Sequence, residues 1–576
     1  MSVPLLSVDR LTTSFRVDGA WLPVIRDISF DIDRRETVAV VGESGSGKSV
    51  TALSIMQLIQ KDMGHIEGAI RLDGTDLLQL DEAAMRKVRG NDIGMIFQEP
   101  MTSLNPVLKV GFQIAEVLRE HRDMSMAQAN AETLRLFDLV RIPDAKRRAN
   151  EHPHSFSGGM RQRAMIAMAL ACQPKLLIAD EPTTALDVTI QAQILELIRD
   201  LQAETGTAVM FITHDMGVVA EIADRVVVML KGDKVEEAPA AELFAAPKQG
   251  YSKMMDLTGA GAEPANEPDA RGDVILEVKG LTTRFPMRGG LLGRVNGNVH
   301  AVEDVSFSVR AGETLALVGE SGCGKSTTGR SILRLVEPAA GEIYFEGQSL
   351  MQASPEEMRQ VRQRMQMIFQ DPYGSLNPRK SIGAAIAEPL RVHGLAQGAE
   401  IEARVAELLD LVGLPPEHAL RFPHEFSGGQ RQRICIARGL ALNPRLIVAD
   451  ESVSALDATI KAQVVNLMLE LQQKLGVGYL FISHDIAVVE RISHRIAVML
   501  LGEIVEIGPR AEVLANPRHP YTRKLIEAVP VPDPSIRGHR RTLITDELKS
   551  PVRPLDWTPP LRTMEKVGPD HFVAGH

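Results

Sequence analysis

The chain has 576 residues, of which 44% are hydrophobic and 24% are charged. This is the composition of an ordinary folded protein, and the chain is too long for a single hydrophobic core. Its formal net charge of −10 opposes non-specific attraction to nucleic acid or to an anionic membrane surface. No apolar run approaches the ~18 residues that cross a bilayer. We therefore expect at least two domains, no nucleic-acid partner and no pore formed by the chain itself.

The N-terminus and the cysteines both favour a reducing, cytoplasmic environment. Residues 1–6 contain no basic segment followed by an apolar core of signal-peptide length, so we expect the chain to stay in the cytoplasm. The three cysteines, Cys172, Cys323 and Cys435, form no C-x-x-C pair. We expect neither a disulfide framework nor a zinc cluster, and interpret all three as small reduced side chains.

The first informative segment is a predicted strand at residues 37–41 that leads into Gly-Glu-Ser-Gly-Ser-Gly-Lys-Ser at 42–49. This sequence fits G-x-x-x-x-G-K-[ST], in which backbone N–H groups surround phosphate oxygens, the lysine reaches the terminal phosphates and the last hydroxyl ligates magnesium. A glycine-rich turn with an exposed lysine is the alternative, but the preceding strand and following helical run favour a phosphate loop. The predicted nucleotide contacts are Gly42, Ser44, Gly45, Gly47, Lys48 and Ser49.

A second candidate anion site lies at Ser157-Gly158-Gly159-Met160, just before an apolar helical run. A Ser-Gly-Gly turn that opens a helix presents free N–H groups and the positive end of the helix dipole. An ordinary helix N-cap explains the motif equally well, because serine and glycine are both common capping residues.

Polar groups follow two further apolar runs, as expected at the carboxyl edge of a buried parallel sheet. The run at 176–179 ends in Asp180 and Glu181, and the run at 209–212 is followed by His214. Burial of two carboxylates is costly unless a cation or a proton transfer requires them. We therefore predict that Asp180 holds magnesium and that Glu181 activates the attacking water. The alternatives are a helix-capping aspartate and a histidine satisfied within the core.

The segment from Thr258 to Asp273 is rich in Gly, Ala, Pro and acidic residues and predicts a flexible linker. We place one domain at residues 1–257, the linker at 258–273 and a second domain at 274–515. Residues 516–576 have no counterpart of equal length in the first half and contain repeated prolines. We expect this extension to be irregular, either docked or partly loose.

The second half repeats every landmark of the first in the same order, with a longer glycine-rich loop at 288–297 that we interpret as a surface insertion. The chain should therefore hold two nucleotides. The repeated candidates are Gly319, Ser321, Gly322, Gly324, Lys325 and Ser326 in the loop, Ser427, Gly428, Gly429 and Gln430 in the Ser-Gly-Gly motif, Asp450 and Glu451 at a strand end, and His484.

Together these motifs resemble the ATP-binding subunit of ABC transporters, twice over and across nearly the whole chain. The resemblance implies an α/β fold with two tandem P-loop NTPase domains, each with a mainly parallel sheet core, a helical lobe and an antiparallel β portion. It implies ATP and Mg²⁺ as cofactors. It also implies that each ATP lies between the phosphate loop of one half and the Ser-Gly-Gly signature of the other.

The resemblance extends to individual side chains. It implies that Glu181 and Glu451 are the catalytic bases, that His214 and His484 contact the γ-phosphate, that Ser49, Gln98, Asp180, Ser326, Gln370 and Asp450 bind magnesium or its waters, and that Phe15 and Phe285 stack on adenine. Phe15 and Phe285 could equally be core residues.

Two departures from the family pattern, Met160 in place of glutamine and Ser452 in place of proline, remove no catalytic group. We therefore predict that both sites hydrolyse ATP. Cys323 lies inside the second phosphate loop and is most simply a small tolerated residue. Because a helix N-terminus lowers a thiol pKa, we also hypothesise that alkylation of Cys323 blocks the second site and that ATP protects it.

A narrower resemblance, to the peptide and nickel importer subfamily, rests on Ser-Leu-Asn-Pro at 103–106 and 375–378 and on the extension motif at 519–525, with an echo at 250–253. Fused twin domains are most similar to glutathione and peptide importers. The implied partners are two permease subunits, docked on segments 99–155 and 371–425, and an extracytoplasmic solute-binding protein. The implied location is peripheral, on the cytoplasmic face of the inner membrane. No cysteine follows Cys435, so we expect no iron–sulfur centre in the extension.

Other functions remain open from the sequence. The solute could be a dipeptide, an oligopeptide, glutathione, an opine or a nickel chelate. A sugar importer with fused cassettes commonly has one degraded site, and neither site is degraded here. A twin-cassette protein of translation would need a long charged linker and one of DNA repair would need zinc cysteines, neither of which the sequence contains.

Overall fold

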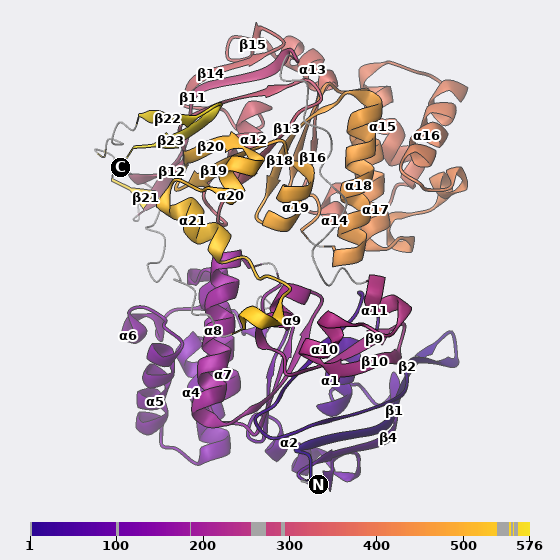
Figure 1. Cartoon of the computed structure of the whole chain (residues 1–576), viewed down its shortest axis with the longest axis vertical. Helices are drawn as coiled ribbons and strands as arrows, with labels where there is room; N and C mark the ends of the chain where they lie inside the picture. The colour runs from indigo at the N-terminus through magenta and orange to yellow at the C-terminus, as the bar shows by residue number, and fades with distance from the viewer. Residues whose placement is uncertain are drawn as a thin grey trace. The chain divides into compact units, whose positions relative to one another are not determined.

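The computed structural model (Figure 1) describes residues 3–98, 103–184, 186–254, 272–289, 294–454, 456–537, 552–554, 557 and 563–575. It divides into two compact units. The first comprises Met1–Leu186, Ile190–Ala260 and Pro530–Arg540, and the second comprises Asp187–Thr189, Gly261–Val529 and Arg541–His576. Most of the predicted linker, residues 258–271, lies outside the described residues.

The first unit contains two sheets and a group of helices. Its antiparallel sheet has the order β2-β1-β4-β5, and its mainly parallel sheet has the order β10-β9-β3-β8-β7-β6. Its strands are β1 (Leu6–Val17), β2 (Ala20–Ile32), β3 (Thr37–Val41), β4 (Gly64–Leu72), β5 (Thr75–Asp76), β6 (Ile93–Ile96), β7 (Leu176–Asp180), β8 (Ala208–Thr213), β9 (Arg225–Leu230) and β10 (Asp233–Pro239). Its helices are α1 (Lys48–Ile55), α2 (Glu82–Val88), α4 (Val110–Arg122), α5 (Met126–Leu139), α6 (Ala145–Arg148), α7 (Gly158–Leu170), α8 (Val188–Thr205), α9 (Met216–Ile222), α10 (Ala240–Ala245) and α11 (Gly250–Met254).

The apolar runs that predicted buried strands form the centre of the parallel sheet. Every residue of β3, β7 and β8 is buried, and the three strands pair in parallel. Their side chains alternate between two cores: Leu176 and Ile178 face a cluster shared with the antiparallel sheet, whereas Leu177 and Ala179 face a cluster shared with α4, α5 and α7. Burial on both faces explains why these strands are continuously apolar.

The second unit repeats this plan. Its sheets have the orders β15-β14-β11-β12-β21 and β16-β17-β18-β13-β19-β20-β23-β22. Its strands are β11 (Val274–Gly289), β12 (Arg294–Arg310), β13 (Thr314–Val318), β14 (Ala340–Phe345), β15 (Gln348–Ser349), β16 (Met365–Ile368), β17 (Leu446–Asp450), β18 (Gly478–Ser483), β19 (Arg495–Leu500), β20 (Glu503–Pro509), β21 (Val552–Arg553), β22 (Met564–Gly568) and β23 (His571–Ala574). Its helices are α12 (Lys325–Ile332), α13 (Pro355–Arg364), α14 (Pro372–Ser375), α15 (Ile382–His393), α16 (Ala399–Leu411), α17 (Gly428–Leu440), α18 (Ala458–Leu475), α19 (Ile486–Ile492), α20 (Arg510–Ala515) and α21 (Pro520–Glu527).

The C-terminal extension is more ordered than the sequence predicted. Its described part contains the helix α21 and the hairpin β22–β23, and β23 pairs with β20 at the edge of the parallel sheet. The prolines that suggested irregular structure lie at 530–560, before the hairpin begins, so they do not interrupt its ladder. The expectation of an irregular tail is therefore wrong for α21 and for this hairpin.

Within the described ranges, no helix is long and apolar enough to span a bilayer.

Candidate nucleotide sites

The first phosphate loop connects β3 to α1, as the motif requires. Gly47 is the N-cap of α1 and has φ of 99°, a conformation that favours glycine. The ammonium of Lys48 donates to the carbonyl oxygens of Gly42 at 2.8 Å and Glu43 at 2.9 Å. The lysine is thus held over the loop, close to where phosphate oxygens would lie.

The predicted polar residues of the first unit gather beside this loop. The hydroxyl of Ser49 donates to Oδ1 of Asp180 at 3.0 Å. The amide of Gln98 donates to Oε2 of Glu181 at 3.0 Å, and Nδ1 of His214 lies 3.3 Å from Oε1 of the same carboxylate. Four segments that are distant in sequence therefore meet at the carboxyl edge of the sheet, where ligands bind in open parallel sheets.

Two adjacent carboxyl groups in this site have pKa values shifted in opposite directions. Burial raises the pKa of Asp180 to about 6, against a hydrogen bond from Ser49 that lowers it. Burial also acts to raise the pKa of Glu181, but hydrogen bonds and charge from His214, together with a hydrogen bond from Thr184, outweigh it and set the pKa at about 2. Glu181 is therefore ionised at neutral pH, whereas burial disfavours the charged form of Asp180.

The second site brings together the same pairs of residues, although Nδ1 of His484 makes no hydrogen bond. Lys325 donates to the carbonyls of Gly319 at 2.7 Å and Glu320 at 2.9 Å. The remaining contacts are Ser326 Oγ to Asp450 Oδ1 at 2.6 Å, Gln370 Nε2 to Glu451 Oε2 at 2.7 Å, and His484 Nδ1 to Glu451 Oε1 at 3.4 Å.

The pKa shifts of the second site also agree with those of the first. Burial raises the pKa of Asp450. For Glu451, burial acts upward, but His484 and Lys325 hold the pKa below its usual value.

The donor atoms fit a magnesium ion. Oδ2 of Asp450 is buried and makes no hydrogen bond, and the guanidinium of Arg330 lies 3.7 Å from it. Hydroxyl and carboxylate oxygens are the ligands that Mg²⁺ prefers, and it is usually bound by one or two carboxylates together with substrate phosphates. The described residues contain no cluster of three or more His, Cys, Asp or Glu side chains that could hold a metal.

The two Ser-Gly-Gly motifs open helices α7 and α17, as predicted, but their caps differ. Ser157 accepts from the N–H of Met160, and Ser427 accepts from the N–H of Gln430. Gln430 returns a second bond, because its Oε1 accepts from the N–H of Ser427 at 3.0 Å. Met160 has no such acceptor, so only the second motif is a complete capping box.

The space around the two glycines of each Ser-Gly-Gly motif explains why glycine occurs there. A Cβ at Gly159 would lie 2.9 Å from Ile190, and one at Gly429 would lie 2.2 Å from Ile460. At the preceding positions, a Cβ at Gly158 would have no atom within 4 Å, and one at Gly428 would meet only Leu456 at 3.8 Å. The second glycine therefore allows close helix packing, while the first leaves the N-terminus of the helix open.

The two aromatic candidates lie on strands at equal positions of the antiparallel sheets. Phe15 of β1 is half-buried, and Phe285 of β11 is 39% exposed. Neither belongs to a buried core cluster among the described residues. Their assignment to adenine stays a prediction.

Cys323 differs from the expectation. The thiol is 1% exposed and belongs to a hydrophobic cluster of the second unit. Burial raises its pKa, although Lys325 acts in the opposite direction. The expected lowering of the pKa by the helix N-terminus is therefore wrong, because desolvation of the thiolate dominates. All three cysteines are buried and free.

Two neighbours of the sites were not predicted from sequence. Thr184 donates to Glu181 Oε2 at 2.9 Å, and Arg330 lies 3.7 Å from Asp450. The corresponding residues in the other half are Ser454 and Leu53. Because neither residue is repeated between the halves, comparison of the two copies could not have found them.

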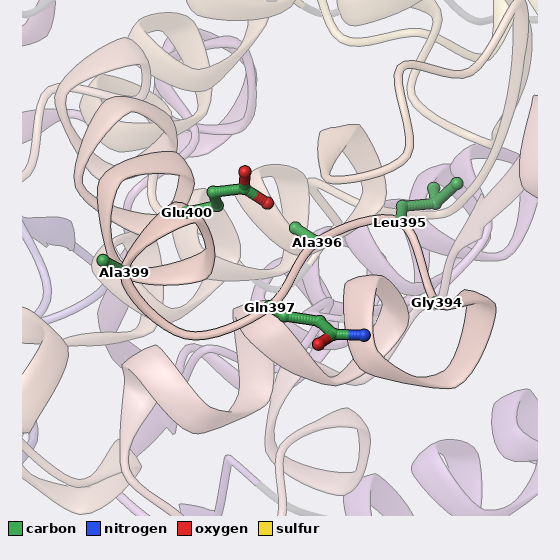
Figure 2. A pocket seen from close by; sticks show the side chains of 6 residues that line it. All are labelled: Gly394, Leu395, Ala396, Gln397, Ala399 and Glu400. Carbon is green, nitrogen blue, oxygen red and sulfur yellow. The ribbon is translucent and has the colours of Figure 1, made fainter.

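A pocket of about 490 Å³ lies elsewhere in the second unit, at the connection between α15 and α16 (Figure 2). None of the predicted site residues lines it. Its lining residues are Gly394, Leu395, Ala396, Gln397, Ala399 and Glu400.

Comparison with known families agrees with this geometry. The profile of the family described as ABC transporter matches residues 25–184 and 302–454. The chain belongs to the ABC transporter family. Its fold is the predicted pair of ABC ATPase domains, and its reaction is ATP hydrolysis. A second profile, described as the C-terminal region of oligopeptide and dipeptide transporters, matches residues 505–554.

Full-length relatives carry a more specific name. The glutathione import ATP-binding protein GsiA of Pectobacterium atrosepticum is 54% identical, with 99% of this chain and 97% of the relative covered. The proteins of the same name from Salmonella typhimurium and Escherichia coli K12 are each 54% identical, with 99% of this chain and 96% of the relative covered. A solved dimeric bacterial ABC transporter cassette is 28% identical, covers 41% of this chain and 98% of its own length, and has a TM-score of 0.37.

Proposed function

We propose that this chain is the ATP-hydrolysing subunit of an importer for glutathione or a closely related peptide. The observation that carries the proposal is the 54% identity to a named glutathione import ATP-binding protein over 99% of this chain, which includes both ATP sites and the extension. The match of residues 505–554 to the oligopeptide and dipeptide transporter region supports a peptide-like solute.

Each site has the groups that phosphoanhydride hydrolysis requires. In the proposed mechanism, Lys48 moves from the loop carbonyls to the β- and γ-phosphates, and its positive charge offsets the charge that develops there. Glu181, ionised at neutral pH, orients the attacking water and accepts its proton. His214, hydrogen-bonded to Glu181, contacts the γ-phosphate. Lys325, Glu451 and His484 have the same roles in the second site.

Bound magnesium would neutralise part of the negative charge of the phosphates. Ser49 with Asp180, and Ser326 with Asp450, would hold the ion or its waters, and Gln98 and Gln370 would orient them. The buried carboxyls with raised pKa values support this assignment.

We further propose that each phosphate loop works with the Ser-Gly-Gly signature of the other half. Lys48 would then pair with residues 427–430, and Lys325 with residues 157–160. The open N-termini of α7 and α17 and their exposed serines support a role in binding an anion.

The importer would include two permease subunits, contacted by the helical lobes at 99–155 and 371–425, and a solute-binding protein that acts through them. The chain would lie on the cytoplasmic face of the inner membrane as a peripheral subunit. The proposed domains are 1–257 and 274–515, joined by a linker at 258–273 and followed by the extension at 516–576.

Uptake of labelled solutes tests the proposal. Cells that lack this chain are complemented with the wild type or with Lys48→Ala, and the uptake of glutathione, dipeptide, oligopeptide, opine and nickel chelate is measured. We expect the wild type to restore glutathione uptake and Lys48→Ala to fail, because the variant cannot neutralise the phosphates.

If the wild type restored uptake of another solute but not of glutathione, glutathione would be excluded as the solute, and the proposal of an importer would stand. Co-purification provides the second control. Recovery of permease subunits supports import, whereas recovery of ribosomes or DNA without permeases would contradict it.

A further inference from the structure

Two short helices occupy equal places after the last strand of each repeat. In the first unit α11 follows β10 and α10, and in the second unit α21 follows β20 and α20. Each helix has a tyrosine as its second residue, Tyr251 or Tyr521. The sequence showed this similarity only as a weak echo, and it indicated no contact for either tyrosine.

Both tyrosines contact a phosphate loop of their own unit. The phenol oxygen of Tyr251 accepts from the backbone N–H of Glu43 at 3.1 Å, and that of Tyr521 accepts from the N–H of Glu320 at 3.2 Å. Each glutamate is the second residue of its loop. The same contact is therefore made twice within one chain.

The anchored residue also contacts the lysine of the phosphate loop. The carbonyl of Glu43 accepts from Lys48 at 2.9 Å, and the carbonyl of Glu320 accepts from Lys325 at 2.9 Å. One loop residue thus has its N–H fixed by the tyrosine and its carbonyl bound to the lysine. A shift of this residue would move the resting position of the lysine.

The helices that carry the tyrosines are fixed to the sheet by buried carboxylates. Glu236 of β10 accepts the N–H groups of Lys248 and Gln249 at 2.9 and 3.1 Å. In the same way, Glu506 of β20 accepts those of Arg518 and His519, both at 2.9 Å. The two carboxylate residues are 8% and 0% exposed, so each anchor is shielded from water.

Glu506, the carboxylate that fixes α21 to the sheet, has one additional contact. Nε2 of His571, in the C-terminal hairpin, lies 2.8 Å from Oε1 of Glu506. A continuous set of contacts therefore leads from strand β23 through Glu506 and α21 to the second phosphate loop.

We propose that Tyr251 and Tyr521 are positioning residues that hold the phosphate loops, and through them Lys48 and Lys325, in the geometry that binds ATP. The phenol accepts from a loop N–H, and a buried N–H without a partner is costly. The extension matched by the oligopeptide transporter profile thereby gains a role in nucleotide binding. Burial raises the pKa of Tyr521 well above its usual value, so its phenol stays neutral at physiological pH. The inference rests on the ATP sites proposed above and is independent of the transported solute.

Binding of a fluorescent ATP analogue with Mg²⁺ to the purified full-length chain tests this role at each site. Lys48→Ala leaves the second site for measurement, and Lys325→Ala leaves the first. Loss of one hydrogen bond of about 1 kcal/mol corresponds to about fivefold in affinity. We therefore expect Tyr521→Phe to raise the Kd about three- to tenfold in the Lys48→Ala chain and to leave it unchanged in the Lys325→Ala chain. Tyr251→Phe should raise the Kd in the Lys325→Ala chain and leave it unchanged in the Lys48→Ala chain.

Tyr479→Phe is the matched control, because its phenol is fully buried in the second unit but donates to the carbonyl of Met468 instead of contacting the loop. It should leave both Kd values unchanged. Weakening at both sites by Tyr521→Phe, or at neither, would overturn the inference. A chain with both lysines replaced should not bind the analogue. Residual binding there would refute the site assignment itself, together with the inference that rests on it.

Discussion

At the scale of single residues, the structure gives Asp180 and Glu181 different environments, and the sequence predicts different roles for them. Asp180 is the last residue of β7, where burial raises its pKa to about 6. Glu181 is one residue further on and has φ of 47°, and its partners His214 and Thr184 contribute to a pKa of about 2. Opposite shifts in neighbouring groups are a common basis for distinct chemical roles.

Asp180→Asn should raise the melting temperature of the nucleotide-free chain at pH 7.5. Between the ordinary pKa of 3.8 and the folded value of about 6, rising pH ionises the buried group and removes up to about 3 kcal/mol of stability. The increase in melting temperature caused by Asp180→Asn should therefore vanish near pH 4. Thermal unfolding of the wild type and the variant at pH 7.5 and near pH 4 measures this difference in melting temperature. The variant should also lose the stabilisation that MgATP gives to the wild type.

Glu181→Gln is the control for that experiment, because its pKa is shifted downward and its ionised form is stabilised in the folded state. It should lower the melting temperature at pH 7.5. An equal effect of the two substitutions would show that their environments do not differ as described.

Cys323 should react slowly with a maleimide at neutral pH. Its thiol is 1% exposed and burial raises its pKa, so the reactive thiolate is scarce. Mass spectrometry of the labelled native chain, compared with the denatured chain, measures the rate. Rapid labelling of the native chain that ATP prevents would restore the original hypothesis of a reactive loop cysteine.

At the scale of secondary-structure elements, the ends of equivalent helices are satisfied by different residues. Arg510, at the start of α20, donates to the carbonyls of Glu490 and Ser493 at the end of α19. The corresponding position in the first unit is Ala240. There, Arg537 of the extension donates to the carbonyls of Ile222 and Ala223 at the end of α9 and pairs with Asp224 at 3.0 Å.

Arg537→Ala should destabilise α9 by about 0.5–1 kcal/mol, the usual contribution of a cation at a helix C-terminus. Hydrogen exchange of the amides in Met216–Ile222 should accelerate correspondingly, while Ile486–Ile492 stays unchanged. Arg510→Ala is the matched control. It should accelerate exchange in Ile486–Ile492 and leave Met216–Ile222 unchanged. Unchanged exchange in both variants would show that solvent satisfies these carbonyls equally well.

The sequence was informative about elements wherever a motif combines a strand, a polar turn and a helix. It predicted β3, β7 and β8 and the order of the loops between them, because continuous apolar runs identify strands buried on both faces. It was wrong about the extension, since prolines at 530–560 suggested irregular structure and the short hairpin after them has a weak signal. Arg537 could not be assigned, because its partners at residues 222–224 are more than 300 residues away.

At the scale of the whole molecule, the internal repeat means that one chain contains two sets of candidate ATP-site residues with closely similar contacts. The lysine, serine, glutamine, two carboxylates and histidine have equivalent partners in both units. Repetition identified these residues from sequence. The same method cannot find residues that occur in one half only, such as Arg330, or small differences such as the incomplete capping box at Met160.

These differences leave every catalytic group in place, so both sites should contribute to turnover. The most direct measurement is the ATPase rate of the chain assembled with its permease subunits, with Glu181→Gln and Glu451→Gln made separately and together. We expect each single variant to lose at least half of the activity and the double variant to lose nearly all of it, because each site then lacks its general base. An unchanged rate in either single variant would contradict the central claim that the repeat provides two working ATP sites.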